Sequence, residues 1–410
     1  MIDTSTLSVR FLLTLCLLLP LGGCHVLYDS IGGDFAGPPD QMAENISSEA
    51  HAIIEKAFAD IGEDDVLIDI HAHMISRNVN PDWHSPFWHP LKYGRTQVYL
   101  SGAGVSAHSE TLEKDYVERM VAQLEQFPRK MRLYLYALDR SYYPDGSVDL
   151  RHTSIYVSNH DVYEISQQYP EHFRPVVSVH PFREDAIEEL HYWADRGVRH
   201  VKWLPNAMGI NPASPRLNDY YDTMIEHDMV LLTHTGDEMA LEEIDAELGN
   251  PLLLRRPLDR GLKVVALHFA SDGEFKDFEN PRHHRRTPGH KLLLRMLDEP
   301  RYDGLLYIDT ASMIFFNHLD EPLLAMLERP DLHGRFVNGS DYPLSALNIT
   351  IWTRLLVTDG LLDEKYRRPL NEIYKYNPML FEYVTKRLIR HPETGQRMRR
   401  EVFLGDPAVW

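Results

Sequence analysis

Short apolar runs recur along the chain from Val66 onward, and stretches with apolar residues at every third or fourth position separate them. The runs are rich in β-branched residues, which is typical of strands that are buried on both faces. In chain order they cover residues 66–70, 132–138, 175–180, 198–204, 229–234, 262–268, 305–309 and 335–341. This pattern predicts eight buried strands.

The intervening stretches are typical of amphipathic helices. One covers residues 184–194, with Gly197 as a stop signal, and another covers residues 220–227. Strands that alternate with helices form parallel βα units, and eight such units close a barrel. We therefore predict an α/β fold, a single-domain (β/α)8 TIM barrel over residues 64–390 with loop insertions, followed by a C-terminal extension over residues 391–410. The longest connection covers residues 80–130, and its aromatic start at 83–90 is suited to a loop over an active site.

The N-terminus has the pattern of a bacterial export signal. Arg10 precedes an apolar stretch over residues 11–20, which is too short to span a bilayer, and Leu21-Gly22-Gly23-Cys24 resembles a lipobox. We predict a lipoprotein signal peptide over residues 1–24 with lipidation of Cys24, then a tether and N-terminal segment over 25–63. His25 after the cysteine favours the outer membrane of the bacterial envelope. The alternative is a plain secretory signal, in which Cys24 is incidental.

Charge and cysteine content narrow the possible partners. The formal net charge is −19, which argues against nucleic acid because phosphate binding needs a basic face. The two cysteines are Cys16 and Cys24, so a metal site in the folded domain must use nitrogen and oxygen ligands. We expect a small-molecule substrate, and a membrane partner through the lipid anchor. A homo-oligomer is compatible with the sequence, which does not fix the number of subunits.

Histidine and aspartate residues stand at the carboxyl ends of several predicted strands, where barrel enzymes place their active sites. Alternation along a strand points the side chains of His71 and His73 in the same direction, so both imidazoles can reach one metal ion. His234, His268 and Asp341 end the fifth, sixth and eighth strands. Each residue alone has an ordinary explanation, such as a buried histidine or a turn-forming aspartate. Together they predict a metal site.

The same motifs resemble the amidohydrolase superfamily, and within it the amidohydrolase-related branch of metal-dependent decarboxylases and lactonases. The resemblance covers roughly residues 64–385. Its motifs are Asp69-Ile70-His71-Ala72-His73, Tyr169-Pro170-Glu171-His172-Phe173, His234-Thr235-Gly236, His268, Gly339-Ser340-Asp341-Tyr342-Pro343 and Asn377-Pro378-Met379-Leu380-Phe381.

The resemblance implies that His71, His73, His234 and Asp341 bind a divalent ion. Zn²⁺ is the preferred ion, and Mn²⁺, Fe²⁺ or Co²⁺ would also suit these ligands. A bound ion lowers the pKa of water, and Asp341 would accept the water proton as general base. His268 would polarise the substrate or ligate a second ion.

Lys202 in the fourth strand decides between one ion and two. In some superfamily members a carboxylated lysine at this place bridges two metals, whereas an ammonium group would bind substrate. We favour one ion, with Lys202, Trp203 and His180 as substrate-binding residues. The predicted activity is hydrolysis of an amide, a lactone or another ester. The alternatives are a non-oxidative decarboxylase and a surface lipoprotein that binds without catalysis.

Overall fold

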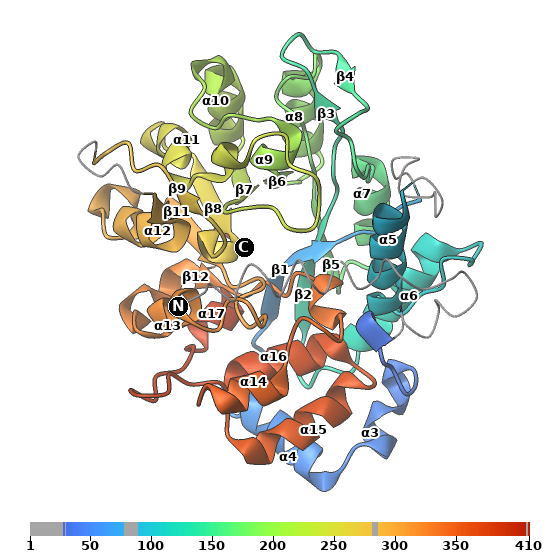
Figure 1. Cartoon of the computed structure of the whole chain (residues 1–410). Coiled ribbons are helices and arrows are strands. Elements are labelled where there is room, and N and C mark those ends of the chain that lie inside the picture. Colours follow the sequence, from blue (N-terminus) through green and yellow to red (C-terminus); the bar gives the residue numbers. More distant parts are fainter. Residues whose placement is uncertain (1–27, 29, 78–88, 281–285, 407–408) are drawn as a thin grey trace.

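Eight parallel strands form the centre of the protein (Figure 1). The computed structural model describes residues 28, 30–77, 89–280, 286–406 and 409–410. Each predicted apolar run overlaps a strand of the structure. The strands are β1 (Leu67–His73), β2 (Met131–Tyr136), β5 (Phe173–Val176), β6 (His200–Trp203), β7 (Val230–His234), β8 (Lys263–Leu267), β11 (Leu306–Asp309) and β12 (Phe336–Val337).

The eight strands pair in parallel around a closed ring. The strands form one sheet in the order β1-β2-β5 and another in the order β12-β11-β8-β7-β6. Parallel bridges join the two sheets at both seams, Val177 with Val201 and Ala72 with Tyr342. At the second seam the Asp341 amide donates to the His71 carbonyl at 2.9 Å. The predicted (β/α)8 barrel is confirmed.

Helices and two small hairpins connect the strands and surround them (Figure 1). The predicted helices at 184–194 and 220–227 appear as α8 and α10. The connecting helices are α5 (Pro90–Gly102), α6 (Leu112–Leu124), α7 (Asn159–Gln168), α8 (Ala186–Asp195), α9 (Pro205–Met208), α10 (Asn218–Glu226), α11 (Arg255–Asp259), α12 (Gly289–Leu297) and α13 (Glu321–Leu327). The hairpins are β3 (Ser141–Tyr142) with β4 (Val148–Asp149) and β9 (Glu274–Phe275) with β10 (Thr287–Pro288).

The described part of the predicted tether is folded against the barrel. It contains η1 (Pro39–Gln41), α3 (Met42–Asn45) and α4 (Ser48–Ala57). These helices lie beside α14 (Thr353–Thr358), α15 (Glu364–Tyr374) and α16 (Pro378–Leu388), and α4 contacts both α15 and α16 (Figure 1). Ser47 caps α4 by accepting a hydrogen bond from the Ala50 amide. Within the predicted tether and N-terminal segment over 25–63, this part is folded, because α4 buries an apolar face of Ile53 and Ile54.

A bulge in β1 sets which side chains face the barrel interior. Ile68 and Ile70 belong to the inner apolar cluster, whereas Ala72 belongs to the outer one. The register between β1 and β2 shifts between Asp69 and Ala72, which inserts an extra residue. The shift turns His71 and His73 inward, above the apolar interior.

The described part of the C-terminal extension packs at the amino-terminal end of the barrel strands. The structure has α17 (Glu401–Leu404) packed on β1 and β12. The indole ring of Trp410 stacks on His200 with a centroid separation of 5.3 Å. His200 begins β6, so this contact lies at the amino-terminal end of the strands. The α17 helix and Trp410 of the C-terminal extension therefore pack against the barrel.

Stability at acid pH should depend on His200. Burial lowers its pKa to about 4, although a hydrogen bond to the Val409 carbonyl opposes the shift. Unfolded His200 takes up a proton near pH 6.5, so its contribution is present above that pH and is lost as the pH falls toward 4. Between roughly pH 7 and pH 5, we expect the free energy of unfolding to fall by about 2 kcal/mol more in the wild type than in His200→Phe. Urea unfolding at both pH values measures these free energies. An equal fall in the two proteins would contradict the role of His200.

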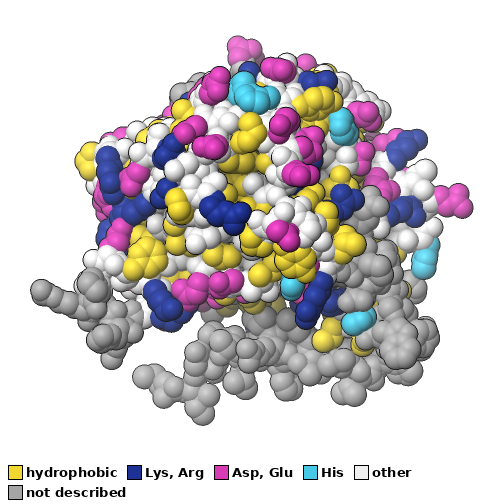
Figure 2. Space-filling model, turned by 90° about the horizontal axis from the view of Figure 1, so that it is seen from above, with side chains coloured by type: hydrophobic (Ala, Val, Ile, Leu, Met, Phe, Trp, Pro, Cys, Tyr) yellow, Lys and Arg dark blue, Asp and Glu magenta, His cyan; other side chains and the backbone are white. Residues whose placement is uncertain are grey.

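The outer surface carries charges of both signs. Figure 2 shows acidic and basic side chains scattered among hydrophobic ones on the face seen from above. In the part of the chain that the structure describes, no helix combines the length and the hydropathy needed to cross a membrane.

Candidate metal centre

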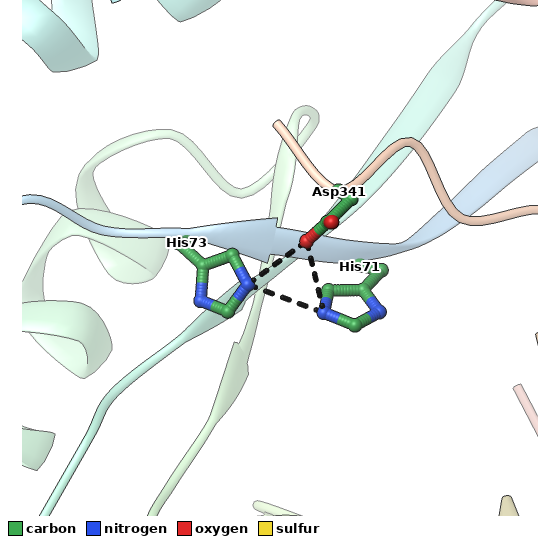
Figure 3. Close-up of side chains that lie close together, drawn as sticks. All are labelled: His71, His73 and Asp341. Carbon is green, nitrogen blue, oxygen red and sulfur yellow. Dashed lines mark hydrogen bonds and ion pairs between the residues drawn. The ribbon is translucent and has the colours of Figure 1, made fainter. Parts of the chain in front are cut away.

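Three side chains converge at the carboxyl end of the barrel (Figure 3). His71 and His73 come from β1, and Asp341 follows β12. The His73 Nε2 atom lies 3.1 Å from Asp341 Oδ1 and 3.2 Å from His71 Nε2. The His71 Nε2 atom lies 3.5 Å from the same carboxylate oxygen. Three potential metal-binding atoms therefore face one another.

Asp309 at the end of β11 fixes the tautomer of His71. The His71 Nδ1–H donates to Asp309 Oδ2 at 2.6 Å, and both side chains are fully buried. A carboxylate can only accept here, so the Nδ1 atom holds the proton and the Nε2 atom presents its lone pair to the cluster. Metal-binding histidines commonly have such a carboxylate partner. Sequence analysis missed Asp309.

The cluster fits a single divalent cation. Nitrogen and oxygen ligands at about 2.1 Å from one tetrahedral ion are roughly 3.4 Å apart, close to the separations in this cluster. Lone pairs at such distances repel each other unless a proton or a cation lies between them. The donor set suits Zn²⁺, Mn²⁺, Fe²⁺ or Co²⁺. The His73 side chain is 31% exposed, which leaves an approach for water or substrate.

The main chain before Asp341 passes close to the two histidines. A Cβ atom on Gly339 would lie 2.9 Å from both Asp309 Oδ2 and His71 Cβ, so a glycine is needed there. The Ser340 amide donates to Asp69 Oδ1, which also accepts from the His71 amide. Asp69 thus aligns the two chain segments.

The carboxylate of Asp341 is held in its ionised form. Burial would raise its pKa, but His268, His73 and Lys202 outweigh burial and lower the pKa to about 2. Its backbone has a φ of +61°, in the left-handed region that aspartate adopts at some cost. Hydrogen bonds on both sides hold this conformation and place the side chain over the cluster.

His268 lies next to the cluster on a strained turn. Its ring centroid is 4.7 Å from that of His71, and its amide donates to Asp309 Oδ1 at 2.6 Å. His268, Phe269 and Ala270 all have positive φ values, and each costs about 1–2 kcal/mol relative to a relaxed conformation. Burial lowers the pKa of His268 well below its usual value, so its imidazole is neutral at pH 7.

His234 lies on the far side of His268, outside the three-residue cluster. The ring centroids of His234 and His268 are 4.8 Å apart. Within the described residues, neither nitrogen of the buried His234 ring has a hydrogen-bond partner, and the nearest acid is Glu238, 3.4 Å from Nδ1. An imidazole in this position can accept a cation or a substrate proton. Its role as a metal ligand stays a prediction.

Lys202 and Tyr136 line the interior just below these histidines. The Lys202 ammonium lies 4.9 Å from the centroid of the Tyr136 ring, and no hydrogen bond to its Nζ atom is found among the described residues. Burial lowers the pKa of Lys202 to about 8, against the opposing effect of Asp309 and Asp341. The Tyr136 ring is 4.8 Å from that of His71. Sequence analysis did not single out Tyr136, which ends an apolar strand.

The side chains of the other two predicted substrate-binding residues are held by contacts within the fold. The Trp203 ring packs on Tyr220 of α10 and donates to the Val179 carbonyl, because it points outward where its neighbour Lys202 points inward. His180 donates from Nε2 to the Met208 carbonyl and accepts at Nδ1 from the Phe182 amide. Substrate binding by Trp203 and His180 stays a prediction, and both side chains already have partners within the fold.

Helix α5 lies against loops at the carboxyl end of the barrel strands. It leaves β1 and contacts the loop after β7 on the opposite side. Arg95 donates to the Ala240 carbonyl at 2.9 Å, and Lys92 pairs with Glu242 at 3.1 Å. Tyr99 of the same helix is close enough for Glu238 and Asp341 to influence its pKa, which burial raises well above the usual value. The described part of the long connection therefore lies near the candidate centre.

Some sequence predictions lie outside the described residues. These are the signal peptide with Cys24 and the aromatic start of the long connection at 83–88.

Solved structures with a similar arrangement share little sequence with this chain. An uncharacterised TIM-barrel protein from Bordetella bronchiseptica is 16% identical, with 75% of this chain and 99% of that chain covered and a TM-score of 0.47. A putative 2-pyrone-4,6-dicarboxylic acid hydrolase from Pseudomonas putida is 18% identical, with 68% of this chain and 82% of that chain covered and a TM-score of 0.39. A 5-carboxyvanillate decarboxylase from Novosphingobium aromaticivorans with bound manganese is 13% identical, with 77% of this chain and 95% of that chain covered and a TM-score of 0.43. No curated protein matches the sequence.

A family profile gives the stronger assignment. The profile described as amidohydrolase matches residues 68–292, more than half of the chain. The matched segment begins within β1 and contains His71, His73, Lys202, His234 and His268. This chain belongs to the amidohydrolase family.

Proposed function

We propose that the protein is a metal-dependent hydrolase that cleaves an amide, a lactone or another ester of a small molecule. The convergence of His71, His73 and Asp341 at the open end of the barrel carries the proposal. His71 and His73 would hold the ion through their Nε2 atoms and Asp341 through its carboxylate, with His234 as the fourth protein ligand. A bound Zn²⁺ or similar ion supplies a water of lowered pKa and an electrophile for the scissile carbonyl.

Three other residues would act on the substrate from fixed positions. The ionised Asp341 would accept a proton from the attacking water and pass it to the leaving group. The neutral His268 would donate to or accept from the substrate beside it. Lys202, a buried cation with no hydrogen-bond partner among the described residues, would bind an anionic group of the substrate. Tyr136 lies close enough to the histidines to contribute its hydroxyl group.

The position of Lys202 also supports the second candidate, a non-oxidative decarboxylase, because a buried ammonium group suits a carboxylate substrate. The two reactions differ in the fate of water. Hydrolysis transfers one water oxygen to the product acid, whereas decarboxylation releases CO₂ and replaces the carboxylate with a proton.

A panel of amides, lactones, esters and aromatic carboxylic acids, assayed with the metal-loaded protein in ¹⁸O-labelled water, tests the proposal. We expect turnover of a member of the first three classes, with one ¹⁸O in the product, and loss of turnover in Asp341→Asn. Release of CO₂ without ¹⁸O uptake would replace hydrolysis with decarboxylation. Full turnover in the variant would remove Asp341 from the reaction, and the absence of both metal and turnover would leave a binding lipoprotein.

Lys202 should remain an unmodified amine. We expect about one equivalent of metal per chain, as in mononuclear zinc enzymes, and no carbamate signal when the protein is equilibrated with ¹³C-labelled bicarbonate. The measurement is ¹³C NMR of the wild type beside Lys202→Met. A carbamate resonance that is lost in the variant, together with a second equivalent of metal, would contradict this and make Lys202 a bridging ligand.

A further inference from the structure

Four exposed large hydrophobic side chains lie in segments that follow the carboxyl ends of β1, β7 and β12. They form the set that we call the apolar rim: Leu91, Met239, Ile244 and Trp352. Exposed apolar side chains gathered on one face are typical of protein or membrane contacts.

Internal contacts hold the apolar rim around the mouth. Leu91 begins α5, and its neighbour Lys92 pairs with Glu242 beside Met239. Across the mouth, the Trp352 ring stacks on Phe316 with a centroid separation of 5.1 Å. Met239 is 57% exposed and Leu91 is 51% exposed, although both lie close to the Lys92–Glu242 ion pair. The structure therefore presents these apolar groups to the outside at fixed positions.

The N-terminal segment reaches the body of the protein at the same end. The Gly33 amide donates to Ser101 Oγ in α5. The Asn348 amide, in the loop that also carries Trp352, donates to the Gly32 carbonyl at 2.6 Å. The Tyr28 ring lies against Gly94 of α5. The N-terminal segment thus joins the folded body between α5 and the loop after β12.

Chain length then limits where a lipid on Cys24 can lie. Only residues 25–27 separate Cys24 from Tyr28, so their Cα atoms are at most about 14 Å apart. The folding of residues 36–57 against α15 and α16 removes the long tether that the sequence suggested. A lipid on Cys24 would therefore place the bilayer beside α5.

We propose that the apolar rim rests on the lipid bilayer that holds the N-terminal anchor, so that the mouth of the barrel faces the membrane. The proposal depends on lipidation of Cys24 and is independent of the reaction catalysed. The net charge of −19 opposes electrostatic binding to anionic lipids, so the attachment requires the anchor together with apolar contact. The candidate metal centre then opens toward the lipid–water interface.

Single cysteines that carry an environment-sensitive nitrobenzoxadiazole label test the orientation. The full chain is expressed with its leader, purified in detergent and reconstituted on vesicles of phosphatidylethanolamine and phosphatidylglycerol. Cleavage removes Cys16 and lipidation blocks Cys24, so the introduced cysteine is the only free thiol. Met239→Cys and Leu91→Cys report on the rim. Ile225→Cys is the matched control, because Ile225 lies in the last turn of α10, which ends near the opposite end of the barrel.

We expect blue-shifted emission and severalfold stronger quenching by spin-labelled lipids at both rim positions than at Ile225. Wild-type protein should float with the vesicles, and a chain without residues 1–24 should not. Equal quenching at all three positions, or stronger quenching at Ile225, would overturn the proposed orientation. A blue shift at the rim without lipid quenching would mean that a second copy covers the rim. Failure of the wild type to float would overturn the anchor itself, whatever the catalytic activity.

Discussion

Replacing Asp309 with asparagine is expected to weaken zinc binding by roughly 10- to 100-fold while leaving the fold intact. In the wild type, Asp309 Oδ1 accepts from the His268 amide and Oδ2 accepts from His71 Nδ1–H. Asparagine has one acceptor oxygen, and the His268 amide requires it. The amide NH₂ group then faces His71 Nδ1 and moves the ring proton to Nε2, where the metal should bind. Competition with a fluorescent zinc chelator measures the affinity.

Two further variants make this result specific. Asp309→Ala removes the orienting bond but leaves the tautomer free, so it should weaken binding no more than Asp309→Asn. Asp69→Asn is the matched control, because Asp69 accepts two amide hydrogen bonds on one oxygen and contacts no ring nitrogen of His71. It should bind zinc like the wild type. Wild-type affinity in Asp309→Asn would show that the tautomer of His71 does not matter.

Lys386→Met should be the most destabilising substitution considered for this chain. Lys386 in α16 is fully buried, pairs with Glu382, and donates to the Gly339 carbonyl at 2.7 Å and to Thr310 at 3.1 Å. Methionine fills the space but leaves a buried carboxyl group and several acceptors without a donor. We expect a loss of about 3–5 kcal/mol in the free energy of unfolding, measured by urea denaturation.

Burial already raises the pKa of Glu382 to about 7, against the opposing charge of Lys386. A double variant, Lys386→Met with Glu382→Leu, should therefore recover much of the lost stability. Arg368→Ala is the surface control, because Arg368 pairs with Glu372 in solvent and its loss should cost less than about 1 kcal/mol. A single Lys386→Met variant as stable as this control would contradict the account of the buried pair.

The barrel was predictable because each of its strands is buried on both faces. Runs such as 229–234 and 262–268 have no polar alternation, and this distinguishes interior parallel strands from surface ones. The N-terminal helices were missed because their glycine- and proline-rich surroundings resemble a linker. Their stability comes from contacts of α4 with α15 and α16, which are more than three hundred residues away in sequence.

The candidate site was partly predictable for a similar reason. His71, His73 and Asp341 were identified because they end strands of one barrel, although the inward direction of the two histidines depends on a bulge that the sequence pattern does not reveal. Asp309 could have been found, since it ends an apolar strand in the same way. Alternation places Trp203 on the outer side of β6, because its neighbour Lys202 was already assigned to the interior. Lys386 resembles an ordinary surface lysine until the packing of α16 is known.

Metal content is the most direct test of the central claim, that His71, His73 and Asp341 hold a divalent ion. The full chain and His71→Ala would be purified, reconstituted with Zn²⁺ or Mn²⁺, and measured by elemental mass spectrometry, with circular dichroism to verify folding. The account predicts about one equivalent of metal in the wild type and a loss of most of it in the folded variant. A wild type that binds no metal after reconstitution, or a variant that keeps the full equivalent, would contradict it.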